Sequence, residues 1–597
     1  MTWAQRRAIV ICVLILFLIL IVWVVSKPRR LPSKGVLVMD AEGQIDEQSS
    51  PGFLGALTGD STPVLHDYLD AIDSARSDPR ITGLVVRIAP LATGWGKLEE
   101  IRSHLIAFQS SGKPSICYLG YDGTGNEEYY LATACQQIWL VPSSEVSIRG
   151  MIAEAMFFRG ALDKFKVVPQ FYHIAEYKTA YNMFTEKGFT APDREQVGSV
   201  LHSIYDQYIS DSSQARHLDR AKFESLVNQG PLLTSEALQN KIVDRLAYWD
   251  QVQDYFKGRN RGWNPISLDR YRASMKQDGR LGGQEIAVVH ATGLIVSGES
   301  QTNVSGGFVM GGDSVASDLR EARTDSSIKA IILRVDSGGG SVVASEVIRR
   351  EVELAEQAKP VVVSMSDVAA SGGYWIATPA SKIVADPDTI TGSIGVLTGK
   401  LNLSGLYGLL GVSTDSVATS DNASLYSDQQ NFTPEQQANI QKSLDETYAE
   451  FTRGVAAGRK LPLDAVQKIA KGREWTGVQA KQLGLVDELG GLDRAVEVAK
   501  DLAKIPASAS VRIVRFPEER NFLRELFQRD DDQLDGRLND LRSDNIKGPV
   551  PESMGELIAY LRTGNLEVSQ SVESTLRRLA DSMGPVQARV PYELHIR

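Results

Sequence analysis

The sequence has few of the residues that usually bind metals. Only three cysteines and seven histidines occur among 597 residues, and none of them are spaced like the ligands of a zinc site. The sequence therefore predicts no metal centre, and we expect no cofactor.

Basic residues are also fewer than acidic residues. Lysine and arginine number 64 against 74 aspartates and glutamates, which gives a formal net charge of −10. Because nucleic-acid binding needs a basic surface, this balance argues against a nucleic-acid partner. A hydrophobic content of 43% is enough for two to four domains with cores of their own.

Several common catalytic signatures are absent. There is no Gly-Lys-Ser/Thr and no G-x-G-x-x-G motif, so the Gly-rich loop at 338–340 is a poor nucleotide site. The G-x-S-x-G elbow fails around Ser371 because Ala369 replaces its first glycine. No histidine lies near Ser371 in the sequence, which leaves a Ser-His-Asp triad without support.

One long hydrophobic run stands at the N-terminus. Residues 9–25 carry no charge and would span about 26 Å as a helix, close to the hydrocarbon thickness of a bilayer. No small-x-small cleavage site follows, so we favour an uncleaved transmembrane anchor over a signal peptide. Basic residues flank both ends, and the charges alone do not fix the orientation.

Two of the cysteines end predicted elements, Cys117 a strand and Cys135 a helix. They would form a disulfide in an oxidising compartment, but buried free thiols are the slightly favoured interpretation.

The chain repeats itself. Residues 129–133 (Tyr-Tyr-Leu-Ala-Thr) recur 245 positions later as 374–378 (Tyr-Trp-Ile-Ala-Thr), and the preceding Lys-Pro dipeptides and following Val-Asp segments also correspond. A fixed period with matching elements is the signature of a tandem duplication.

Short apolar strands alternate with amphipathic helices in each copy, which predicts an α/β fold of parallel βαβ units. Helical stretches at about 192–228 and 432–470 extend the two copies. The strands are expected at 81–88, 114–119, 136–141 and 167–174, then at 329–335, 360–366, 382–386 and 411–417. The predicted divisions are an anchor at 9–25, a first repeat at 35–250, a connection at 251–283, a second repeat at 284–515 and a tail of unassigned role at 516–597.

The duplication singles out a serine and a lysine. Ser371 follows an apolar strand on a small-residue turn at the start of a short helix, and its counterpart in the first copy is Asn126. Lys178 lies among aromatic and small residues, and its counterpart in the second copy is Ala423. We infer an ancestral unit with both groups, of which each copy kept one. A desolvated, neutral lysine is a base that can activate a serine nucleophile.

Backbone N–H groups near the serine complete the predicted site. Gly339 or Gly340, together with Gly372, are candidates for an oxyanion hole, since both stretches belong at the carboxyl ends of neighbouring strands. Ser393 is a candidate for orienting the lysine amine, although a plain turn serine is equally consistent with the sequence.

These motifs closely resemble the long form of the signal peptide peptidase A family, also called protease IV, over about residues 35–515 and the anchor. The matching segments are 331–341, 366–377, 391–396, 177–180 and 472–491. The resemblance implies a crotonase-like (caseinolytic-protease-like) fold in tandem, with nucleophile Ser371, base Lys178, orienting residue Ser393 and oxyanion donor Gly339. One departure is Gly338, where the family usually has proline, which would leave the turn less restricted.

The resemblance further implies a serine endopeptidase that degrades released signal peptides. It would be held in the inner membrane by one span, as a homotetramer facing the periplasm. Two alternatives remain: a catalytically silent, membrane-anchored peptide-binding scaffold of the same fold, and a crotonase-like acyl-CoA enzyme.

Overall fold

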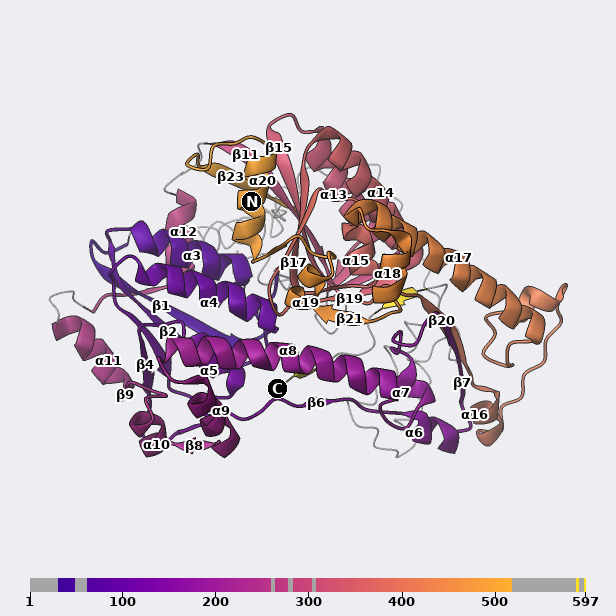
Figure 1. Ribbon diagram of the computed structural model, residues 1–597, viewed down its shortest axis with the longest axis horizontal. Helices are drawn as coiled ribbons and strands as arrows, with labels where there is room; N and C mark the ends of the chain where they lie inside the picture. The colour runs from indigo at the N-terminus through magenta and orange to yellow at the C-terminus, as the bar shows by residue number, and fades with distance from the viewer. Residues whose placement is uncertain are drawn as a thin grey trace, which may run out of the picture.

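The computed structural model describes residues 31–48, 62–258, 263–277, 283–302, 308–517, 587–589 and 595–596. Two α/β units lie next to each other in Figure 1, the first in indigo and magenta and the second in pink and orange. The segment predicted as an anchor, 9–25, lies outside the described residues. No helix within the described ranges is long and apolar enough to cross a membrane.

The first unit is built on a six-stranded sheet in which every neighbouring pair is parallel. Its strand order is β10-β1-β2-β3-β4-β9. The strands are β1 (Gly35–Gly43), β2 (Ile81–Leu91), β3 (Ser115–Leu119), β4 (Gln137–Leu140), β9 (Arg245–Leu246) and β10 (Pro265–Ser267).

The second unit repeats this order. The path β23-β11-β15-β17-β18-β22 is parallel throughout and matches the first sheet strand for strand. Its strands are β11 (Gln284–Thr292), β15 (Ile328–Ser337), β17 (Val361–Ala370), β18 (Lys382–Ala385), β22 (Glu488–Leu489) and β23 (Val511–Phe516). β17 also pairs with β19 (Ile390–Gly392), which pairs in turn with antiparallel β21 (Glu474–Thr476). The predicted duplication is thus visible in the topology.

Equivalent helices occur in the same order in both units. In the first unit they are α3 (Leu65–Ser77), α4 (Trp95–Gln109), α5 (Asn126–Ala132), α8 (Ala191–Ala215), α9 (Arg220–Gln229) and α11 (Trp249–Phe256). In the second they are α13 (Gly312–Thr324), α14 (Val342–Ala358), α15 (Gly372–Ala377), α17 (Pro434–Arg459), α18 (Leu463–Ile469) and α20 (Leu492–Leu502).

The two long helical stretches are each interrupted once. Both α8 and α17 start at a threonine whose side chain accepts a backbone N–H of the first turn, with proline in that turn. His217 after α8 and Lys460 after α17 have positive φ angles of 52° and 55°. A left-handed residue terminates a helix, so each stretch continues as a second helix.

Two segments differ from expectation. The strand predicted at 411–417 is wrong, because the structure has no regular element there and Gly411 turns the chain at a φ of 73°. The strand nearest to this segment is β20 (Leu397–Asn402), which belongs to a separate seven-stranded sheet rather than to the main sheet of the second unit. The expected connection, 251–283, contains β10, which extends the first sheet beside β1.

β20 joins the two repeats. It pairs antiparallel with β7 (Val168–His173) from Leu397 opposite His173 to Asn402 opposite Val168. This ladder extends sideways from the second unit, at the right of Figure 1. Because Lys178 follows β7 closely, the pairing carries it into the second repeat.

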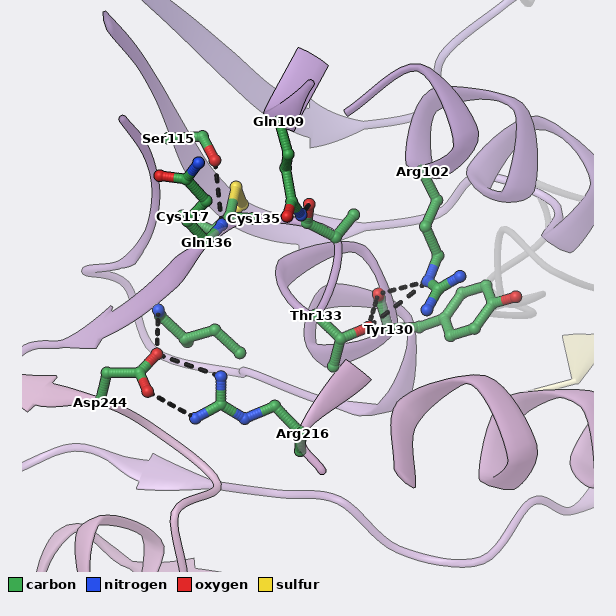
Figure 2. Close-up of a disulfide and its surroundings, with 12 residues drawn as sticks. Arg102, Gln109, Ser115, Cys117, Tyr130, Thr133, Cys135, Gln136, Arg216 and Asp244 are labelled. Atoms are coloured by element: carbon green, nitrogen blue, oxygen red, sulfur yellow. Dashed lines mark hydrogen bonds and ion pairs between the residues drawn. A yellow bond between two sulfur atoms is a disulfide. The ribbon is translucent and has the colours of Figure 1, made fainter. Parts of the chain in front are cut away.

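Cys117 and Cys135 form a disulfide with a Cα–Cα distance of 5.7 Å, so the preference for free thiols was wrong. The bridge joins β3 to the turn after α5. The N–H of Gln136 donates to Ser115 Oγ at 2.9 Å beside it (Figure 2). The pairing of β3 with β4 brings the two cysteines together, and sequence spacing does not reveal this.

Candidate active site

Ser371 lies between the end of β17 and the start of α15, fully buried. Its backbone has φ 57° and ψ −115°, a conformation that non-glycine residues rarely adopt. Strained backbone of this kind persists only where its surroundings enforce it, and it is common at functional sites. The N–H of Ser371 donates to Gly392 O at 2.8 Å, which fixes the turn to β19.

Lys178 reaches this serine from the other repeat. Its Nζ lies 2.6 Å from Ser371 Oγ, although the two residues are 193 positions apart. The same nitrogen lies 2.9 Å from the carbonyl oxygen and 3.0 Å from the Oγ of Ser393. All three side chains are buried, so the structure brings the predicted serine, lysine and orienting serine together.

The surroundings of Lys178 keep water away from its amine. Burial lowers the pKa of Lys178 to about 7, and the nearby charge of Glu474 acts in the opposite direction. Burial also raises the pKa of Glu474 to about 8. A lysine of this pKa is substantially neutral near pH 7 and able to accept a proton.

Glycines make room for the lysine. A Cβ at Gly472 would lie 2.5 to 2.7 Å from backbone and Cβ atoms of Lys178, and one at Gly395 would lie 3.2 Å from its Cδ. Gly472 has a φ of 76° and its N–H donates to Ile394 O at 2.8 Å. Gly472 opens the family-like segment 472–491, but nothing in the sequence pattern assigns it a role.

Ser393 is held in place from the second repeat. It has a positive φ of 49°, and its N–H donates to Arg473 O at 2.7 Å. Its Oγ donates to Gly472 O at 3.4 Å and lies 3.0 Å from Lys178 Nζ.

The predicted oxyanion glycines lie close to one another, and Gly372 directly follows Ser371. A Cβ at Gly372 would lie 2.7 Å from Ser345 Oγ and 3.1 Å from both Gly339 Cα and Gly340 N, so a side chain at this position would crowd the glycine turn. The N–H of Gly339 donates to Ser337 Oγ at 3.1 Å, and Ser337 Oγ donates to Gly293 O at 2.6 Å. These bonds fix the turn that lacks the family's proline at Gly338.

An extended backbone segment occupies the space next to this turn. β24 (Gln587–Arg589) runs antiparallel to β16 (Gly339–Ser341) and also pairs with Leu397 of β20. The strand of the tail therefore adds to the edge that holds the glycine turn. A peptide bound in this way makes main-chain hydrogen bonds to the protein.

The positions 245 residues away in the other copy lack these groups. Asn126 begins α5 and its side-chain oxygen accepts the N–H of Arg149 at 2.9 Å. Ala423 lies exposed in a short 3-10 helix. Within the described ranges, neither repeat has a second serine–lysine pair at the equivalent place.

One family domain matches the chain twice, and individual relatives match most of its length. The domain of peptidase family S49 matches residues 107–260 and again 353–506. "Serine protease SPPA, chloroplastic" of Arabidopsis thaliana is 33% identical over 494 residues, 81% of this chain and 72% of that protein. "Protease 4" of Salmonella typhi is 36% identical over 499 residues, 79% of each chain.

Among solved structures, a ClpP1 mutant from Listeria monocytogenes is 14% identical with a TM-score of 0.22, covering 35% of this chain and 94% of that chain. The two matches to the S49 domain agree with the duplication seen in the sequence and in the strand order. This chain belongs to peptidase family S49 and is a serine peptidase.

Proposed function

We propose that Ser371 and Lys178 form the catalytic dyad of this peptidase. The observation that carries the proposal is the 2.6 Å contact between Lys178 Nζ and Ser371 Oγ in a fully buried setting. A neutral amine has one lone pair and two N–H groups. The lone pair accepts the Ser371 hydroxyl proton, while the two N–H groups donate to the carbonyl and Oγ of Ser393.

The proposed reaction is acyl transfer. The alkoxide of Ser371 attacks a peptide carbonyl, the protonated Lys178 gives its proton to the leaving amine, and water then hydrolyses the acyl-enzyme. The N–H groups of Gly372 and of the Gly339–Gly340 turn stabilise the oxyanion. Access of Gly339 to the substrate requires its N–H to leave Ser337 Oγ.

The proposed substrates are peptides bound in extended form, with released signal peptides as the physiological class. The pairing of residues 587–589 with the glycine turn and β20 supports an edge suited to extended chains. The enzyme is an endopeptidase in this proposal, and each repeat has the crotonase-like superfold.

The proposed location is the inner membrane, with residues 9–25 as a single-pass anchor and the catalytic region in the periplasm. The Cys117–Cys135 disulfide supports an oxidising compartment. We further propose a homotetramer. Exposed apolar side chains around α16 (Ser404–Leu409) and the following loop support an interface there.

Replacing each member of the dyad tests the proposal. Ser371→Ala and Lys178→Met should both abolish cleavage of an internally quenched apolar peptide while the thermal unfolding temperature stays near that of the wild type. A fluorophosphonate reagent should label Ser371 in the wild type and fail to label either variant. Turnover by Ser371→Ala would contradict the proposal.

A further inference from the structure

One face of α4 in the first repeat contacts the second repeat along its length. Glu100 Oε2 accepts the N–H of Leu492 at 2.9 Å, and His104 Nε2 lies 3.2 Å from Asp493 Oδ2. Lys97 occupies the N-terminal end of the same face. Its contacts, unlike those of His104, lead to β15 and β17, the two strands that carry the candidate active site; Glu100 also reaches β15, through an ion pair with Arg334.

Lys97 bridges two carboxylates of the second repeat. Its Nζ donates to Asp336 Oδ2 at 2.6 Å and to Asp367 Oδ2 at 2.7 Å. The side chain is only 7% exposed. Burial opposes a charge on Lys97, but the charges of Asp336 and Asp367 outweigh burial and raise its pKa. The ammonium group therefore stays charged and holds two carboxylates that would otherwise repel each other.

Both aspartates lie where the regular ladder between β15 and β17 is broken. Val335 pairs with Met365 and Ser337 with Ala369, so one residue of β15 faces three of β17. Asp336 is that one residue, and its Oδ1 accepts the N–H of Val368 at 3.2 Å. Such bulges re-aim the residues that follow them. The residues that follow this bulge are the Gly339–Gly340 turn after β15 and Ser371 after β17.

Asp367 is fixed to α4 by a second contact. Its Oδ1 accepts the backbone N–H of Lys97 at 2.9 Å, so it caps the N-terminus of α4 from another repeat, where a carboxylate is favoured. A Cβ at Gly94 would lie 2.2 to 2.4 Å from the Asp367 carboxylate. Glycine at this position is what lets the carboxylate approach the helix.

We infer that Lys97 is a positioning residue of the active site: by bridging Asp336 and Asp367, it sets the distance between the glycine turn and Ser371. The first repeat thus supplies two lysines to the second, a neutral one as base and a charged one as a clamp. This inference rests on the proposed roles of Ser371 and the glycine turn.

The full-length protein carrying Lys97→Met tests the inference. Misplacing catalytic groups by about 1 Å costs roughly 10²-fold in rate, so kcat on an internally quenched apolar peptide should fall by about that factor, with KM little changed. Affinity for a peptide aldehyde, which forms a tetrahedral adduct with the serine, should fall in proportion to kcat/KM.

His104→Leu is the matched control, because it removes a cross-repeat contact from the same face of α4 without touching β15 or β17. It should keep kcat and aldehyde affinity even if the unfolding temperature drops. An equal loss in both variants would mean that α4 only docks the repeats, and would overturn the inference. Wild-type kcat in Lys97→Met would also overturn it.

If Lys97→Met does not fold, Asp336→Asn tests the inference instead, because it keeps the shape of the side chain and removes the charge that pairs with Lys97. A lowered kcat with unchanged KM supports the clamp, and an unchanged kcat overturns it. Ser371→Ala assayed in parallel separates the two hypotheses, because turnover by that variant would refute the dyad itself rather than the clamp.

Discussion

Gly472 and Lys178 are in contact through their backbones: a Cβ added at Gly472 would lie 2.5 Å from the nitrogen of Lys178 and 2.6 Å from its Cβ. The second repeat therefore shapes the pocket of a lysine that belongs to the first. The φ of 76° at Gly472 adds a second reason for glycine at this position.

Gly472→Ala should displace Lys178 and lower kcat by roughly 10²-fold, the usual cost of a misplacement of about 1 Å. Steady-state kinetics on the quenched peptide measure this. Gly484→Ala is the matched control, since Gly484 has the same φ of 76° but its added Cβ would meet only the Leu461 side chain at 3.5 Å. Similar losses in both variants would point to backbone strain rather than to the lysine.

Activity should depend on pH through Lys178. The proposed active form is the neutral amine, and the pKa of Lys178 is about 7. The rate should therefore be low in acid, rise as pH increases through about 7 and level off above it. A pH profile of kcat/KM measures the rise. Lys178→Arg should show no rise, because a guanidinium stays protonated. A wild-type profile that is flat from pH 5 to 9 would contradict a lysine base.

Glu474 should set the position of that rise. Burial raises the pKa of Glu474 to about 8, so this carboxyl group is only partly ionised near pH 7. Its ionised fraction raises the pKa of Lys178 against the effect of burial, so Glu474→Gln should lower the pKa of Lys178 by a small amount. The rise in kcat/KM should then move to lower pH. Glu195→Gln is the control, because Glu195 is an exposed partner of Arg473. A profile of Glu474→Gln that moves to higher pH would contradict the electrostatic explanation.

The disulfide should stabilise the first repeat. Its cysteines are 18 positions apart, and closing a loop of this size contributes about 3 kcal/mol in the chain-entropy description. Replacing Cys117 and Cys135 by serine should lower the free energy of unfolding in urea by about that amount. Reductant should destabilise the wild type and leave the variant unchanged. Thiol titration of the denatured, unreduced protein should find Cys12 alone; three free thiols would contradict the bridge.

The sequence determined the two residues at the centre of the proposed site. Ser371 and Lys178 emerge from the sequence duplication, because the residue at the 245-position offset in the other copy, Asn126 or Ala423, cannot replace either of them. The parallel α/β order of both repeats followed from short apolar strands alternating with helices. These features depend on the local residue pattern and on the similarity between the two copies, and both can be read directly from the sequence.

Tertiary structure alone decided how the two halves meet. The antiparallel pairing of β7 with β20 places Lys178 beside Ser371, while 411–417 forms no strand. The bridge from Lys97 to Asp336 and Asp367 spans 239 and 270 positions, and the Cys117–Cys135 pair depends on the β3–β4 register. Contacts of this kind depend on the distance between elements in space, which residue spacing along a chain does not specify.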